Sequence, residues 1–450
     1  MAITRREFIQ GAGAAGVLAA SGCAATRTER EPALPIPAQP ILVVVFIDGG
    51  NDWLNTMPPM RGSNRNTYEA ARPTLAVNTS QAFDLGDLDC GLNDDLTGFA
   101  DLHMRGRVAW FPGIGMPNPN LSHFEAGDLW GQGRAQPNNT GWLGRFADAA
   151  FDANDVLRGI TVTGDVPLMF RGATRSFVSI SSSSGFVYPA WLRAGRIGAP
   201  HDPNLLEAQF AAAVSAAQVG SGGQQAALEA AARSGLLFHD AQNLFGQDGA
   251  LAPRTPSVLY PGDEGYEVTT TRGGRLSGGL SGRLKLIAQM IAAGLPGQVY
   301  FARIGGWDTH SNQLQDHPNL MRQLGGAIRS FYDDLASIET EHGNAQARTM
   351  ILAYSEFGRR IRENDGGTDH GTAGLAFALG RAVHGGFYGD YPDLAANLAD
   401  SRNNGNMVST LDYRSVYATV LDRWLGQSAA QTNDSLGTFG GVPFPRLGFL

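Results

Sequence analysis

The feature that most constrains the fold is a run of seven apolar residues, Ile41 to Ile47, most of which are β-branched. A strand that is apolar at every position is expected where helices cover both faces of a parallel sheet. Three further apolar runs follow at 108–111, 298–304 and 349–354. These runs predict the buried strands of one parallel sheet.

Helical patterns lie between and after the predicted strands. Apolar residues recur every three or four positions in 284–295, 320–338 and 413–425, which indicates helices with one buried face. Strands that alternate with helices predict an α/β fold. The region 150–280 differs, because it contains two Ala-rich helical patterns, at 205–219 and 224–238. We interpret it as a helical insertion or cap on the same sheet.

The composition of the chain indicates a globular protein and limits the residue types that could bind a metal. The 450 residues are 43% hydrophobic, which is enough for a full core, and carry a formal net charge of −8. An acidic chain without a basic stripe argues against nucleic acid as a partner. The only two cysteines are Cys23 and Cys90, so no disulfide framework is expected. Any metal site must therefore use histidines and carboxylates.

The N-terminus has the pattern of an export signal. Arg5 and Arg6 precede a short Gly/Ala-rich stretch, which is about half the roughly 20 residues that a membrane span needs. Cys23 follows small residues, as in a lipobox, and is the candidate lipid anchor. We predict a twin-arginine signal at 1–25, a Pro-rich linker at 26–40 and one α/β domain at 41–450. The predicted location is the periplasm or, through lipid on Cys23, the cell envelope.

Polar residues follow each predicted strand at its carboxyl end. In parallel α/β sheets these ends meet at one edge, where ligands bind. Chain order thus proposes a single shared site. Its predicted members are Asp48, Asp52, Asn55, Asn118, Asn120, Ser122, His123, Asp308, His310, Glu356, Asp369 and His370.

Histidines and carboxylates without thiols suit a divalent metal, for which we predict Zn²⁺, with Mn²⁺ or Ca²⁺ as alternatives. The predicted ligands are Asp48, Asp52, Asp308, His310, Glu356, Asp369 and His370. Ser122 is the predicted nucleophile and His123 the predicted acid. The amides of Asn55, Asn118 and Asn120 would contribute binding groups around the cofactor.

Simpler interpretations remain open for several of these residues. Asp48 is also typical of a turn, and Asp52 with Asn55 is typical of a helix cap. Glu356 is close in sequence to two arginines, at 359 and 360, and an ion pair with either would give it a supporting role.

Several motifs resemble a bacterial family known as domain of unknown function 1501, which is grouped with the alkaline phosphatase superfamily. The matching segments are 49–55, 118–124, 141–145, 307–310, 355–359, 366–371 and 412–417. The resemblance implies export and a three-layer α/β sandwich with a mostly parallel central sheet and helices on both faces. It also implies that Asp48, the Asp308–His310 pair and the Asp369–His370 pair bind metal. The chain departs from the superfamily pattern at Glu356-Phe357, where many members have Asp-His.

Together these observations predict an exported, metal-dependent hydrolase of phosphate or sulfate esters, acting on a small-molecule or polymer substrate. The alternative is a non-catalytic envelope protein that keeps the fold for binding. Hydrolysis of a carboxylic ester through Ser122 is less favoured, because no Gly-x-Ser-x-Gly motif surrounds this serine.

Overall fold

The computed structural model describes residues 30–117, 119–134, 138–152, 155, 157–183, 251–266 and 279–450. Four predicted features lie outside the described residues: the export signal with Cys23, the binding residue Asn118, and the two Ala-rich helices at 205–219 and 224–238. The described part of the predicted linker, residues 30–40, contains no helix or strand.

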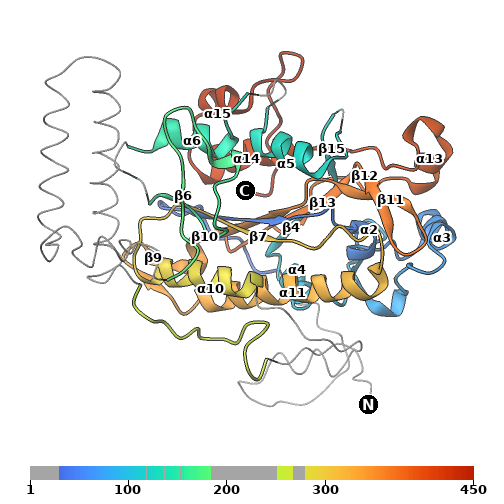
Figure 1. Cartoon of the computed structure of the whole chain (residues 1–450), viewed down its shortest axis with the longest axis horizontal. Helices are drawn as coiled ribbons and strands as arrows, with labels where there is room; N and C mark the ends of the chain where they lie inside the picture. The colour runs from blue at the N-terminus through green and yellow to red at the C-terminus, as the bar shows by residue number, and fades with distance from the viewer. Residues whose placement is uncertain are drawn as a thin grey trace, which may run out of the picture.

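One central sheet organises the described chain (Figure 1). At its centre, β1 (Ile41–Ile47) pairs in parallel with β7 (Val299–Ile304) on one side and β10 (Thr349–Tyr354) on the other. The strand order is β14-β4-β13-β10-β1-β7-β5-β6, and β15 also pairs with β4. The outer strands are β4 (Val108–Gly115), β5 (Gly159–Thr161), β6 (Val178–Ser179), β13 (Gly374–Gly380), β14 (Gly386–Phe387) and β15 (Leu411–Asp412).

The sheet is mostly parallel. Among the described strands, β13 runs against its two neighbours, β10 and β4, whereas the other pairings in the sheet are parallel. Because β13 lies between β4 and β10, these two strands point the same way. The polar segments that follow β1, β4, β7 and β10 therefore begin at the same edge.

Two long helices cover one face of the sheet. Val43 and Val45 of β1 are fully buried against α10 (Gly279–Ala292) and α11 (Gln313–Leu335). The buried side chains of these helices recur at helical spacing, for example Leu324, Ile328 and Phe331. Burying each such aliphatic or aromatic side chain contributes about 1.5–3 kcal/mol. The shorter α4 (Phe99–Met104) packs into the same cluster.

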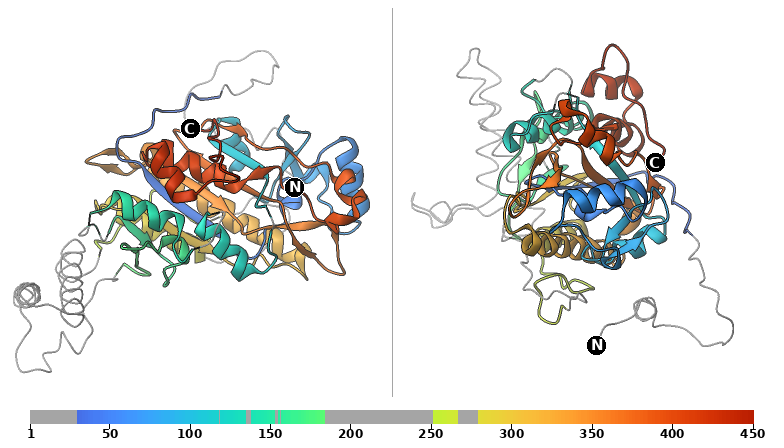
Figure 2. Two further views of the ribbon diagram at one scale, coloured as in Figure 1. Left: turned by 90° about the horizontal axis from the view of Figure 1, so that it is seen from above. Right: turned by 90° about the vertical axis from the view of Figure 1, so that its right-hand side faces the viewer.

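The alternate residues of β1, Leu42 and Val44, face a second apolar cluster on the opposite side. It is formed by α6 (Trp142–Ala150), α14 (Tyr413–Thr419), a π-helical turn (Val420–Trp424) and α15 (Ala429–Leu436), with α5 (His123–Gln132) alongside. Figure 2 shows the same two helical layers in views turned by 90°. The predicted α/β architecture, with a mostly parallel sheet and helices on both faces, is confirmed.

The remaining described elements are short. The hairpin of β11 (Gly358–Glu363) and β12 (Thr368–Gly371) carries two of the predicted site residues. The others are α2 (Trp53–Thr56), α3 (Gly62–Ala71), η1 (Thr79–Gln81), β2 (Ala82–Asp84), β3 (Gly91–Asn93), η2 (Leu168–Phe170), β8 (Glu339–Thr340), β9 (Gly343–Asn344), α12 (Ala345–Arg348), α13 (Leu394–Ala399) and η3 (Ser401–Asn403). Within the described ranges, no helix combines the length and apolar character required to span a bilayer.

Candidate metal centre

The site is assembled where adjacent parallel strands end. Ile47 at the end of β1 is in register with Ile304 at the end of β7, and Phe46 is in register with Tyr354 at the end of β10. The loops that start after these three strands therefore begin side by side. The segment after β4 starts at the same edge and leads to His123 at the beginning of α5.

Gly49 allows two of these loops to touch. Its φ is +124°, and a Cβ there would lie 2.5 Å from the backbone nitrogen of Asp308. This conformation is readily available to glycine alone. The close backbone contact fixes Asp308 next to the end of β1.

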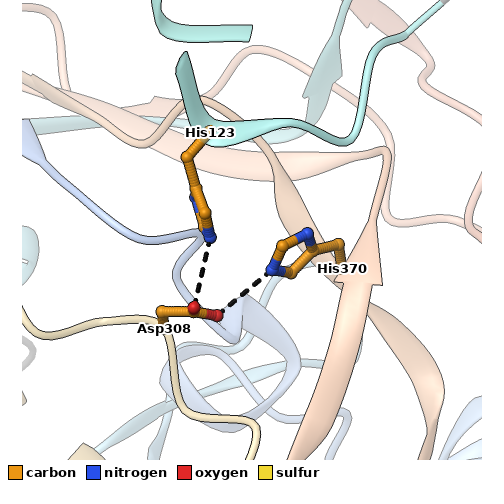
Figure 3. Close-up of side chains that lie close together, drawn as sticks. All are labelled: His123, Asp308 and His370. Atoms are coloured by element: carbon orange, nitrogen blue, oxygen red, sulfur yellow. Dashed lines mark hydrogen bonds and ion pairs between the residues drawn. The ribbon is translucent and has the colours of Figure 1, made fainter. Parts of the chain in front are cut away.

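Three histidines surround the carboxylate of Asp308. Its Oδ1 is 3.2 Å from His310 Nε2 and 3.2 Å from His370 Nε2, and its Oδ2 is 3.4 Å from His123 Nε2. The Nε2 atoms of His310 and His370 are 2.9 Å apart. Figure 3 shows His123 from α5 and His370 from β12 pointing at Asp308 from two sides. His123, Asp308 and His370 have ligand atoms within 4.8 Å of one another, close enough to hold a metal ion.

The Nδ1 atom of each of these histidines, on the side of the ring away from Asp308, faces an oxygen. His123 Nδ1 is 2.6 Å from Glu356 Oε1, and His370 Nδ1 donates to the carbonyl of Leu121 at 2.8 Å. His310 Nδ1 lies 3.5 Å from Asp369 Oδ1. A histidine whose Nδ1 donates to an acceptor presents an Nε2 lone pair, which is the form that binds a metal.

Electrostatics favour an ionised carboxylate in the cluster. Partial burial would raise the pKa of Asp308, but the hydrogen bond and charge of Arg359 outweigh it and lower the pKa to about 2. Burial lowers the pKa of His370, which favours its neutral form. The hydrogen bond to Glu356 raises the pKa of His123. Asp308 is therefore anionic at neutral pH, as a metal ligand must be.

Arg359 is a functional residue that sequence reasoning did not assign to the site. Its side chain is fully buried, and it donates to Asp308 Oδ1 at 2.7 Å. It also donates to backbone carbonyls of the neighbouring loops, at Gly49, Gly50, Trp307 and Thr368. Glu356 does not form the ion pair with Arg359 that the sequence suggested as an alternative, because each residue supports a different member of the cluster. The arginine in the 355–359 motif was the available signal.

Ser122 and Asn120 lie just before α5, the helix that begins with His123. Ser122 immediately precedes α5, its side chain is exposed, and its backbone nitrogen donates to Asn120 Oδ1 at 2.7 Å. Asn120 also donates to Glu125. In the described part of the chain, no hydrogen bond joins the Ser122 hydroxyl to the histidines or to Asp308. What links this hydroxyl to the cluster is the adjacency of Ser122 to His123 in the chain.

Asp52 is not brought into the cluster, which corrects its prediction as a metal ligand. Its side chain is fully buried and pairs with the equally buried Arg72 at 2.6 Å, while Gln313 also donates to it. Asn55, predicted to bind near the cofactor, accepts from Arg72 and Tyr68 and donates to the carbonyl of Leu75. Asp52 and Asn55 are therefore unavailable to the cluster, because their side chains form buried contacts within residues 52–75.

Asp48 and Asp369 lie near the cluster in different ways. Asp48 follows β1 and is half-buried, and burial together with the nearby charge of Glu356 raises the pKa of its carboxyl. Asp369 lies behind His310, as described above, and accepts from Asn364 at 3.1 Å. The hydrogen bond from Asn364 lowers the pKa of Asp369.

The donor set fits a divalent cation. Bonds of about 2.0–2.2 Å in a tetrahedral arrangement separate neighbouring ligand atoms by about 3.3–3.6 Å. The distances of 3.2 Å from Asp308 Oδ1 to the Nε2 atoms of His310 and His370 are close to this spacing. Three imidazole nitrogens and one carboxylate oxygen suit Zn²⁺, and also Mn²⁺. Side chains of the cluster are partly exposed, Asp308 by 46%, so a ligand can reach them from solvent.

Comparisons with known proteins agree with the predicted resemblance. Residues 247–434 match the family model described as "Protein of unknown function (DUF1501)". This match confirms the resemblance over the part of the chain that carries Asp308, His310, Glu356, Asp369 and His370. A comparison with curated proteins gave no match.

Two solved structures align over most of the chain with low scores. A protein of the alkaline phosphatase superfamily from Vibrio parahaemolyticus has 8% identity and a TM-score of 0.32, covering 90% of this chain and 75% of its own. A 2-O GAG sulfatase has 10% identity and a TM-score of 0.29, covering 77% of this chain and 65% of its own. Scores at this level support no argument about fold or chemistry.

Proposed function

We propose that this protein is a metal-dependent hydrolase that acts on phosphate or sulfate esters. The observation that carries the proposal is the convergence of the His310, His370 and His123 Nε2 atoms on the carboxylate of Asp308. These four side chains would hold the cation, for which Zn²⁺ is the first choice and Mn²⁺ or Ca²⁺ the alternatives. When bound, such an ion polarises an ester oxygen and lowers the pKa of a nucleophile.

The chain's own residues supply the other requirements of the reaction. Arg359 and Glu356 fix the directions of Asp308 and His123, so the donor atoms are preorganised before substrate arrives. Ser122 supplies a hydroxyl next to His123 in the chain. Partial exposure of the cluster gives an ester access to it.

The test is turnover by the purified full-length protein on a panel of phosphate and sulfate esters. The protein is stripped with chelator and reloaded with Zn²⁺ or Mn²⁺. We expect turnover that disappears in the Asp308→Ala, His310→Ala double variant. A correctly folded, metal-loaded protein that hydrolyses no ester of either kind would refute the proposal.

Ser122→Ala distinguishes two nucleophiles within the same proposal. Loss of turnover with unchanged metal content identifies the Ser122 hydroxyl as the attacking group. Retained turnover identifies water.

We also propose export by the twin-arginine route, with lipid attached at Cys23. The paired arginines at 5 and 6 and the small residues before Cys23 support this proposal. Replacement of both arginines by lysine is expected to keep the protein in the cytoplasm. Cys23→Ala is expected to abolish incorporation of labelled fatty acid, and equal labelling of that variant would refute lipidation.

A further inference from the structure

We infer that the site holds a single cation, bound by His123, Asp308, His310 and His370, and that Glu356 and Asp369 orient two of these histidines without touching the cation. The inference rests on the metal binding in the proposed function, but not on the substrate. It assigns Glu356 and Asp369 as positioning residues, although the sequence predicts both as ligands.

The three imidazoles share one arrangement. Each has its Nδ1 atom facing an oxygen: Glu356 Oε1 for His123, the Leu121 carbonyl for His370, and Asp369 Oδ1 for His310. Each has its Nε2 atom facing Asp308. Acceptors behind metal-binding histidines fix the ring orientation and the tautomer, and such acceptors are usually not ligands themselves.

Glu356 is held by donors from within the protein. It is completely buried, and its Oε1 accepts from His123 Nδ1 and from the backbone nitrogen of Gly49 at 3.0 Å. Its Oε2 lies 3.0 Å from Ser355 Oγ, whose hydroxyl also lies 2.7 Å from the carbonyl of Ile47. A cation bound to Glu356 would have to displace these donors inside a closed environment, where losing a partner is costly.

The other predicted carboxylates make contacts away from the cluster of histidines around Asp308. Asp369 Oδ1 accepts from Asn364 and faces His310, and its Oδ2 lies 3.8 Å from Arg360. Asp52 has no exposed area, and its Oδ2 pairs with Arg72, whereas its Oδ1 has no hydrogen-bond partner. Of the predicted ligands this leaves Asp48, and one carboxylate is too few for a second cation, because zinc sites of this kind use three or four protein ligands.

One short segment supports most of the cluster from behind. In 355–359, Glu356 binds His123 and Arg359 binds Asp308. Phe357, which stands between these two residues in the sequence, packs against two of the histidines. Its ring centroid lies 4.8 Å from that of His123 and 4.8 Å from that of His370. The segment that follows β10 thus orients three of the four donors while contributing none.

The test measures metal content and affinity in the full-length protein rather than activity. Protein stripped with chelator is titrated with Zn²⁺ by calorimetry, and bound zinc is counted by elemental analysis after dialysis. Co²⁺ loading adds an absorption spectrum that reports ligand number and geometry. We expect one zinc per chain.

The variants separate ligands from positioning residues. Glu356→Gln and Asp369→Asn should each still bind one zinc, with affinity reduced about 10- to 100-fold, as for other residues that support metal ligands. Asp308→Ala should lose stoichiometric zinc. Glu363→Gln is the matched control. Glu363 lies on the β11–β12 hairpin that also carries Asp369, but it accepts hydrogen bonds from the backbone of Thr74 and Leu75. The zinc affinity of this variant should equal that of the parent protein.

Several results would overturn the inference. Two zinc ions per chain in the parent protein would exclude a single-cation site while leaving the proposed hydrolase intact. If Glu356→Gln and Asp369→Asn both bind zinc with the parent affinity, neither residue positions a histidine. If a folded Glu356→Gln protein loses its zinc completely, Glu356 is a ligand. If Glu356→Gln fails to fold, the partly exposed Asp369→Asn decides the matter alone. A parent protein that binds no zinc, Mn²⁺ or Ca²⁺ would refute the proposed function as well.

Discussion

The Nε2 atoms of His310 and His370 lie 2.9 Å apart, although the Nδ1 atom of each imidazole already faces an oxygen. With both Nδ1 atoms protonated, two Nε2 lone pairs face one another, and each is 3.2 Å from a carboxylate oxygen of Asp308. Three electron-rich atoms at this spacing repel one another unless a cation or a proton lies between them. A bound cation removes this repulsion, as does a proton on one of the two Nε2 atoms.

Zinc should consequently stabilise the fold. A ligand that binds only the folded state at 100 times its dissociation constant adds about 2.7 kcal/mol to the free energy of unfolding. We expect this gain in the parent protein and its absence in His310→Ala, whose side chain is partly exposed and whose loss leaves the core intact. Denaturant titrations with zinc and with chelator measure it. If zinc stabilised the parent protein and His310→Ala equally, it would bind at a site that does not include His310.

Arg359 should be essential to stability as well as to the site. Its buried guanidinium joins the loops after β1 and β7 to β12 and to Asp308. Arg359→Lys leaves several buried carbonyls without a donor, and each costs about 1–3 kcal/mol. We expect a total loss of about 3–5 kcal/mol in the free energy of unfolding, measured with denaturant.

Arg360→Lys is the matched control for this loss. Arg360 is the next residue on β11, is partly exposed, and makes one long ion pair with Asp369. Its replacement should change the free energy of unfolding by less than about 1 kcal/mol. A similar effect of the two substitutions would contradict the role of the buried network.

The buried pair of Asp52 and Arg72 should behave as a structural unit. Both side chains have no exposed area. Arg72→Met leaves an uncompensated buried carboxylate and should lower the free energy of unfolding by about 3–5 kcal/mol. Adding Asp52→Asn should recover part of that loss, which a double-mutant cycle measures. Asp52→Asn alone should keep the parent zinc content, and loss of zinc from that folded variant would restore Asp52 as a ligand.

The sequence was sufficient to predict the four strands that lead into the site and the edge of the sheet at which the site lies. Long apolar runs such as 41–47 bury both faces, and parallel strands bring the following loops together. His310 and His370 could therefore be predicted from their place after or near a strand end. The strand β13 (Gly374–Gly380) was not predicted, because a short apolar run cannot be told from a buried helix segment by its pattern alone.

Roles within the site depended on contacts that the sequence does not encode locally. Glu356 and His123 are separated by 233 positions, and only the folded chain shows that the glutamate faces this histidine. Asp48 and Asp52 follow the same strand, yet Asp52 turns inward to Arg72. Arg359 binds mainly backbone carbonyls, which are present in every sequence, so its place in the 355–359 motif was the only signal and did not reveal its partners.

A last prediction concerns the stability of the core at mildly acidic pH. His103 in α4 is buried, and its Nδ1 accepts a hydrogen bond from Trp110 Nε1 at 3.1 Å. Burial lowers the pKa of His103 from 6.5 to about 4. Because the folded state favours the neutral ring, its contribution is complete above the unfolded pKa of about 6.5 and is lost as the pH falls toward 4. The loss between pH 7 and pH 5 should be about 2 kcal/mol.

His103→Gln isolates this contribution, since the glutamine oxygen can accept the same indole hydrogen but does not titrate. Denaturant titrations at several pH values, with chelator present throughout to exclude metal binding, compare the two proteins. The parent protein should lose about 2 kcal/mol more than the variant between pH 7 and pH 5, because all other titrating groups are shared. Parallel pH profiles would show that His103 tolerates protonation in the folded state, and that the Trp110 contact does not require a neutral ring.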